Sequence, residues 1–80
     1  MTPEEVAEYN EDALLADGFE EALIGVAERI NLSVAAYDVD KIIKILMERD
    51  GMNDEEAIEY FEFNIRGAWM GEHTPVYIYK

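Results

Sequence analysis

Carboxylates are the most abundant groups in this sequence that could do chemistry. Its 80 residues contain 19 Asp and Glu against six Lys and Arg, a formal net charge of −13. An EF-hand calcium loop needs oxygen ligands at positions 1, 3 and 5, Gly at 6 and Glu at 12. A window from Asp38 puts Ile42 at the third ligand position, and a window from Asp50 puts Met52 at the second. The spacing therefore excludes an EF-hand, and we expect no metal site.

Residues suited to catalysis are few. His73 is the only histidine, Ser33 is the only serine, and there is no cysteine. A zinc site normally takes three or four His, Cys or carboxylate ligands, which a single histidine does not supply. Gly67 and Gly71 lack the Lys and Ser/Thr of a phosphate-binding loop. We therefore expect a protein that is not an enzyme and has no cofactor. A weaker alternative is a ligand site or small active site near the end of the chain, formed by Asn64, Trp69, Glu72 and His73.

Two helices are predicted in the first half of the chain. Thr2-Pro3-Glu4-Glu5 has the pattern of a capping box, and it begins a short helix over 3–9. Residues 10–16 carry weak signals and are predicted to be irregular. Asp17-Gly18-Phe19-Glu20 repeats the capping logic before apolar residues at helical spacing, which predicts a helix over 18–30. Its apolar face would consist of Phe19, Ala22, Leu23, Val26, Ala27 and Ile30.

Two further helices follow in the second half. Asp38 caps a helix over 39–49, and Gly51 ends it, because glycine tolerates the left-handed conformation found there. Asn53 and Glu56 form another capping box, which begins a helix that runs to about residue 67. The residues expected to be buried on these two helices are Val39, Ile42, Ile43, Leu46, Met47, Ala57, Ile58, Phe61, Ile65 and Ala68.

Two segments have the composition of β-strands. Residues 32–37 are bounded by turn formers, residues 76–79 alternate Val-Tyr-Ile-Tyr, and 71–75 form a loop between helix and strand. Because two helices joined by one tight turn separate the strands, we expect the second strand to return antiparallel to the first. The predicted fold is α+β, in the order α-α-β-α-α-β, with the helices packed on one face of a two-stranded antiparallel sheet. Residues 1–80 would form one small domain.

Most of the excess negative charge has an explanation in helix electrostatics. An acid at a helix N-cap or in the first turn is favoured by about 0.3–1 kcal/mol, because it faces unpaired backbone N–H groups. Ten of the 19 acids fall at such positions in the predicted helices. They are Glu4, Glu5, Asp17, Glu20, Glu21, Asp38, Asp40, Asp54, Glu55 and Glu56.

A narrower acidic surface remains on the fourth predicted helix. Glu55, Glu59 and Glu62 are spaced i, i+4 and i+7, so they form one stripe with neighbours about 5–6 Å apart. This separation is close to that of phosphates along a nucleic-acid strand. The stripe is either a solvated helix face, which is the more common case, or a docking surface for a basic partner.

Aromatic side chains late in the chain are the other candidates for binding. Phe63 lies off the apolar face of its helix, so we expect it to be exposed and to mark a contact patch or a homodimer. Trp69 is more often a core residue in such a setting. In the alternative, Trp69 and Met70 are exposed with Phe63 and anchor an interface.

Several short segments of the sequence resemble those of a family of small acidic proteins from tailed-phage and prophage genomes. They are Tyr37-Asp38, Ile45-Leu46-Met47, Arg49-Asp50-Gly51-Met52, Glu55-Glu56-Ala57, Glu59-Tyr60, Asn64, Gly67-Ala68, Gly71 and Thr74-Pro75. The resemblance covers about half the chain. It implies the cytoplasm of a bacterial host and an accessory or counter-defence role, but it carries over no catalytic residue. We expect Asn64, a poor residue for mid-helix, to bond to the loop near residues 71–74.

Together these observations predict a non-enzymatic accessory protein that binds a basic protein partner. It could inhibit a host nucleic-acid-binding machine by offering carboxylates in place of phosphates. The alternative is a self-associating scaffold that uses its aromatics. A surface this negative should repel nucleic acid and anionic lipid, and the acidic N-terminal residues predict no secretion signal. The predicted partner-binding residues are Glu55, Glu59, Glu62, Phe63, Trp69 and Met70.

Overall fold

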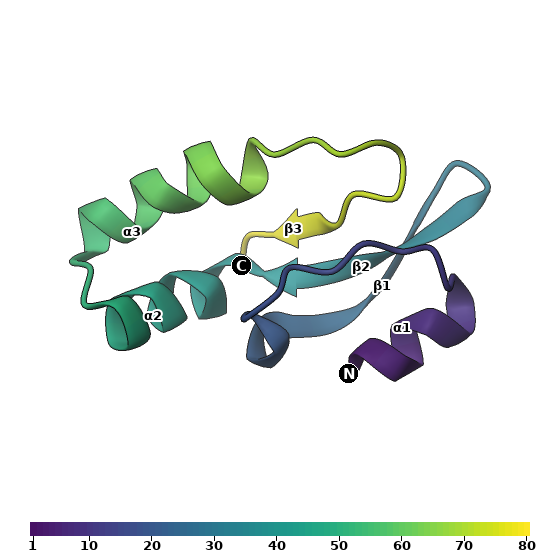
Figure 1. Cartoon of the computed structure of the whole chain (residues 1–80), viewed down its shortest axis with the longest axis horizontal. Coiled ribbons are helices and arrows are strands. Elements are labelled where there is room, and N and C mark those ends of the chain that lie inside the picture. The colour runs from purple at the N-terminus through teal and green to yellow at the C-terminus, as the bar shows by residue number, and fades with distance from the viewer.

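The structure, a computed structural model, describes all 80 residues as an elongated α+β fold with extents of 37 × 21 × 21 Å. A β-hairpin and a third strand form the sheet in one half, and a helical hairpin forms the other half (Figure 1). In chain order the elements are α1 (Pro3–Tyr9), the 3-10 turn η1 (Glu20–Ala22), β1 (Leu23–Arg29), β2 (Leu32–Asp38), α2 (Val39–Asp50), α3 (Asp54–Tyr60), the π-helix η2 (Phe61–Arg66) and β3 (Val76–Ile78).

The α-helices begin where the capping signals predict. Thr2 and Glu5 form the reciprocal hydrogen bonds of a capping box at 3.2 and 2.9 Å, and Asn53 and Glu56 form theirs at 2.9 Å each. The Asp38 carboxylate accepts a hydrogen bond from the Lys41 N–H at 3.3 Å. These local bonds satisfy backbone donors that have no partner inside the helix, which is why short sequence motifs suffice to locate them.

The predicted helix over 18–30 is wrong. Asp17 caps no helix, η1 contains only three residues, and the chain then enters β1. The β-branched Ile24 and Val26 and the glycine between them are poor helix formers. The prediction followed the helical spacing of the apolar residues and gave too little weight to this low helix propensity. A two-residue turn at Ile30-Asn31 joins β1 to β2, and Asn31 adopts a left-handed φ of 58°.

The sheet has three strands in the order β1-β2-β3, not two. β1 pairs antiparallel with β2, while β3 pairs parallel to β2, so the predicted antiparallel pairing of 32–37 with 76–79 is also wrong. The reason is that α2 begins at the residue after β2 and continues in the same direction (Figure 1). The chain reverses at Gly51–Asn53 and again between residues 67 and 75. Two reversals return β3 parallel to β2.

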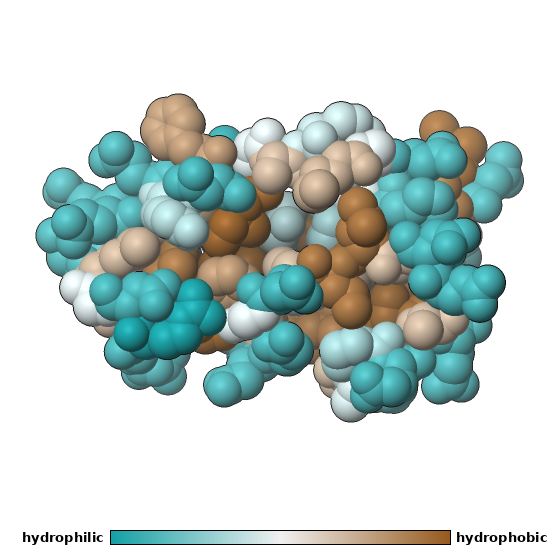
Figure 2. Space-filling model, viewed as in Figure 1, coloured by the Kyte–Doolittle hydropathy of each residue, from teal (hydrophilic) through white to brown (hydrophobic).

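The core surrounds the central strand β2. Ala35 and Tyr37 are buried with residues from α1, η1, α2 and α3. The irregular segment over 10–18 crosses the sheet (Figure 1), and its Ala16 N–H donates to the Tyr37 hydroxyl at 2.8 Å. On this side of the molecule, hydrophobic side chains lie in the middle and hydrophilic ones surround them (Figure 2). The segment without regular structure therefore closes the core.

The helical hairpin extends beyond one end of the sheet instead of covering its face (Figure 1). Phe61 connects the two halves, since its ring packs edge-on against Tyr77 at 5.4 Å and near Tyr79 at 6.4 Å. Because α2 and α3 have no layer of strands beneath them, part of their predicted buried face is open. Ile58 is 42% exposed, and Met47 and Ala68 are exposed as well.

Candidate protein-binding surfaces

The last helix changes its pitch in the middle of the predicted acidic stripe. From Phe61 it continues as the π-helix η2, which ends with a hydrogen bond from the Gly67 N–H to the Glu62 carbonyl at 3.0 Å. A Cβ at position 67 would lie 2.9 Å from that carbonyl and 3.1 Å from the carbonyl of Phe63. The π-turn therefore leaves no room for a side chain at position 67, which explains the glycine there. Because the change of pitch falls between Glu59 and Glu62, α-helical spacing holds only for Glu55 and Glu59.

The three carboxylates of the stripe are all exposed. Glu62 lies 3.7 Å from Arg66, whereas Glu55 and Glu59 form no ion pair. The wider charge prediction is confirmed for seven of the ten acids, which lie at the caps or first turns of α1, α2 and α3. Glu20 and Glu21 begin the short turn η1, and Asp17 lies outside it. Glu55 and Glu59 thus resemble most acids of the chain, which form no ion pair.

Phe63 projects from η2 into solvent, as predicted, and it is 76% exposed. Together with Glu59 and Asn64 it borders a shallow depression beside the helix. The predicted bond from Asn64 to the loop over 71–74 is not formed: the side chain is exposed and has no hydrogen-bond partner. Phe63 therefore lies beside a free carboxylate and a free amide.

Trp69 is not a core residue, contrary to the favoured prediction. It is 68% exposed, and the Arg29 guanidinium lies 5.2 Å from its ring centroid. The same guanidinium donates to the carbonyls of Glu72 and Thr74 at 2.9 and 3.1 Å. Met70 is 71% exposed, and its N–H donates to the Thr74 hydroxyl at 2.9 Å. Hydrogen bonds thus hold the backbone of this loop in place, while the side chains of Trp69 and Met70 remain exposed to solvent.

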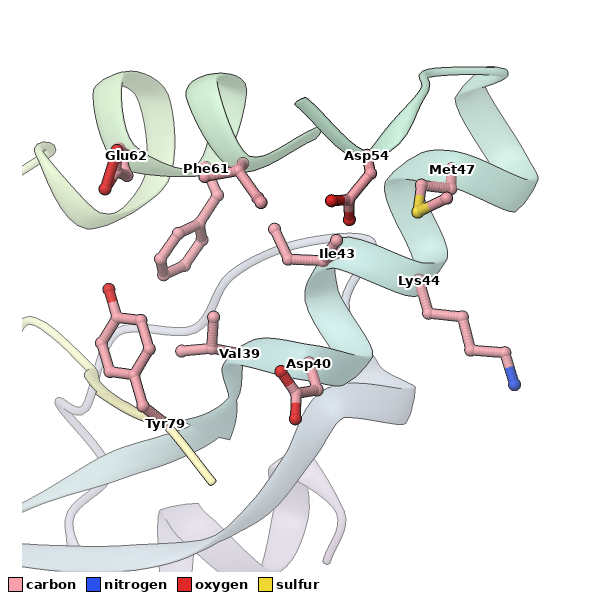
Figure 3. A pocket seen from close by; sticks show the side chains of 10 residues that line it. Val39, Asp40, Ile43, Lys44, Met47, Asp54, Phe61, Glu62 and Tyr79 are labelled. Carbon is pink, nitrogen blue, oxygen red and sulfur yellow. The ribbon is translucent and has the colours of Figure 1, made fainter. Parts of the chain in front are cut away.

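A groove with a volume of about 410 Å³ lies between α2 and α3. Val39, Ile43 and Phe61 point into it, and Tyr79 bounds one end (Figure 3). The remaining lining residues are Asp40, Lys44, Met47, Asp54, Ile58 and Glu62. The groove was not predicted, because it lies between two helix faces whose apolar spacing predicts that they are buried. Of the predicted partner-binding residues, only Glu62 lies in it.

The predicted weaker site near the end of the chain contains one contact that the sequence does not signal. The Asn10 amide donates to the Ser33 carbonyl at 2.8 Å and lies 3.1 Å from His73 Nδ1. These residues are far apart in sequence, so no local pattern could reveal the cluster. The contact ties the segment after α1 to β2 and to the loop before β3, which gives His73 and Asn10 a structural role.

Asp38 joins the sheet to the helical hairpin through its carboxylate. Besides capping α2, it lies 3.2 Å from the Lys80 ammonium. Burial acts to raise the pKa of Asp38, but hydrogen bonds from Lys80 and from the Lys41 N–H outweigh this and hold the pKa below its ordinary value. The ionised form of Asp38 is therefore favoured by the fold.

Comparison with known proteins gives no further guide. No protein-family model matches the chain, and the comparisons with curated proteins and with solved structures give no match either. The similarity to phage proteins thus stays a prediction. None of the helices combines the length and apolar character needed to span a bilayer.

Proposed function

We propose that this chain is a non-enzymatic accessory protein that binds a basic protein partner through the outer face of α3 and η2. The main support is that unpaired carboxylates and an exposed aromatic ring lie close together on that helix. The free carboxylates of Glu55 and Glu59 lie within two turns of the exposed ring of Phe63. Aromatic anchors next to complementary charge are common in protein interfaces, where the ring contributes affinity and the charges speed association.

The finer proposal follows from the resemblance to phage proteins. The partner would be a nucleic-acid-binding protein of a bacterial host, and the carboxylates would meet the cations that normally bind phosphates. The change of pitch at Phe61 limits this imitation to Glu55 and Glu59, with Glu62 displaced from the regular spacing. Inhibition would then depend on charge in one small area, not on the total charge of the molecule.

The test is affinity capture from bacterial lysate, followed by measurement of the affinity for the captured protein at low and high salt. Changing Glu55, Glu59 and Glu62 together to Gln should weaken binding about tenfold, if each exposed ion pair contributes about 0.5 kcal/mol. The same variant should show a flatter salt dependence, since fewer ion pairs are screened.

A matched control removes three charges elsewhere. Changing Glu4, Glu8 and Glu11 to Gln leaves the capping-box residue Glu5 in place and alters the net charge equally. If this control weakens binding as much as the triple change on α3, the partner senses only overall charge. Unchanged affinity of the α3 variant would rule out the outer face as the binding surface.

A second candidate function is self-association, because the side chains of Phe63, Trp69 and Met70 are all largely exposed. In this alternative the protein is a small scaffold, and copies meet through these apolar groups. Binding would then resist added salt. Sedimentation at high concentration distinguishes the two proposals: a dimer that Phe63→Ser dissociates favours the scaffold, and a strict monomer excludes it.

A further inference from the structure

We infer that the groove between α2 and α3 binds one basic amphipathic helix of a protein partner. This inference rests on the proposed function, since it specifies which part of a basic partner the molecule would recognise. It adds a surface that the outer face of α3 does not include, apart from Glu62. The length of the groove, its exposed apolar lining and its charge support this inference.

The groove follows α2 for just over two turns. Val39, Ile43 and Met47 line it from α2 at positions i, i+4 and i+8. Asp54 and Ile58 line the facing side from α3, and Phe61 and Glu62 line it from the start of η2, where the α-helical spacing ends. Val39 and Met47 are eight residues apart, so at 1.5 Å per residue the groove can accommodate about 12 Å of a bound helix.

Only part of the apolar lining is packed within the chain, where Val39 and Phe61 belong to the hydrophobic core. α2 and α3 run in opposite directions (Figure 1), and two helices paired in this way leave a groove into which the side chains of a third can pack. Phe61 forms the buried part of the floor, while Met47 and Ile58 remain exposed. An amphipathic helix that inserts apolar side chains at i, i+4 and i+7 is the usual ligand of such a groove.

The charge of the groove selects a cationic helix. Asp40, Asp54 and Glu62 line it, and the only cation among the lining residues is Lys44. The Lys44 ammonium extends away from the apolar floor (Figure 3). A second copy of the chain would bring a net charge of −13 to this acidic site, so self-association here is disfavoured. Lys or Arg residues beside the apolar stripe of a partner would instead complement the carboxylates.

The experiment uses a synthetic helical peptide with Leu at i, i+4 and i+8 and Lys at flanking positions. Titration by calorimetry gives the affinity, and backbone NMR shifts give the location. Ile58→Glu should weaken binding about tenfold, although it adds negative charge, because it removes apolar surface from the groove. A purely electrostatic association would become tighter with the same substitution. Met47→Glu, on the opposite helix, provides an independent second variant.

Two matched controls make the result specific. Ile30→Glu makes the same substitution at an exposed position in the turn between β1 and β2, outside both the groove and the outer face of α3, and it should leave the affinity unchanged or slightly higher. A peptide of identical composition, shuffled so that Leu surrounds the helix, should bind more weakly. Equal binding of the two peptides overturns the inference, as do unchanged or tighter binding by Ile58→Glu and shifts that map away from α2 and α3. A dimer in sedimentation that Ile58→Glu dissociates would instead assign the groove to a second copy.

The outcome is independent of the outer face. Changing Glu55 and Glu59 to Gln alters the proposed binding face without touching the groove. If this pair of changes weakens capture of the basic partner while Ile58→Glu has no effect on the peptide, the proposed function stands and the groove inference fails. The reverse result retains the groove and removes the outer face.

Discussion

The two halves of this molecule cover their apolar side chains to different extents. In the sheet half, four successive residues of β2, from Val34 to Tyr37, are buried. In the helical half, Met47, Ile58 and Phe63 are exposed. The sheet half is covered by α1 and by the segment that follows it, while the groove between α2 and α3 has no cover. The helical half therefore keeps apolar surface available for partners, although Ile42, Leu46 and Phe61 bury its inner face.

Polar contacts show the same division. Around the sheet, Asn10, Arg29 and Asp38 each bond to groups distant in sequence. On the outer face of the last helix, Glu55, Glu59 and Asn64 have no such partners. Long-range bonds stabilise a particular tertiary arrangement, whereas unpaired exposed groups cost little and can pair in a complex. Three comparisons of matched variants test this division.

The largest effect is expected at Phe61. It is only 1% exposed and packs against Tyr77, so Phe61→Ala should lower the free energy of unfolding by about 3–5 kcal/mol. Phe63→Ala, two residues along the same helix, should change it by less than about 0.5 kcal/mol. Urea denaturation followed by circular dichroism measures both. If Phe61→Ala does not fold, Phe61→Leu gives a measurable intermediate loss. Similar losses at Phe61 and Phe63 would contradict the separation of a buried inner face from an exposed outer face on this helix.

A smaller effect is expected at Gly67, which the π-turn encloses. Gly67→Ala forces a methyl group against two backbone carbonyls, and we expect a loss of about 1–3 kcal/mol. Gly25→Ala in β1 is the control, because a Cβ there meets nothing within 4 Å. It should change the stability by less than about 1 kcal/mol, in the stabilising direction. Thermal unfolding distinguishes the two, and an unaffected Gly67→Ala would show that the wide turn is not required.

The smallest effect concerns pH at the junction between the halves. Because the fold lowers the pKa of Asp38, its stabilisation is fully present above the pKa of the unfolded chain, about 3.9, and is lost as pH falls through the lower folded value. Lys80→Met should reduce stability at neutral pH by about 1 kcal/mol or less. The difference from the parent protein should shrink in acid.

The control for this prediction is Lys41→Met. Lys41 contributes its backbone N–H to Asp38, and its side chain forms no ion pair. The difference in stability between Lys41→Met and the parent protein should therefore stay small at every pH from 2 to 7. A difference between Lys80→Met and the parent that grows toward low pH would contradict the lowered pKa.

The exposed residues of the candidate surface were partly predictable. Phe63 lies off the apolar line of its helix, so its exposure followed from helical spacing alone. Trp69 could not be placed this way, because its environment depends on Arg29 from a strand 40 residues earlier. The groove escaped prediction for a related reason. Spacing shows that Ile58 and Met47 lie on apolar faces, but not whether another layer covers those faces.

The sequence by itself determined the starts of the three α-helices, the left-handed stop at Gly51 and the two strands over 32–38 and 76–78. The helix starts and the stop at Gly51 depend on bonds and conformations within a few residues, which local side chains control, and the strands were located by their composition. Tertiary structure alone decided that residues 23–29 form a strand and that β3 runs parallel to β2. Strand pairing satisfies backbone groups with partners far along the chain, so it can overrule an apolar spacing that suits a helix.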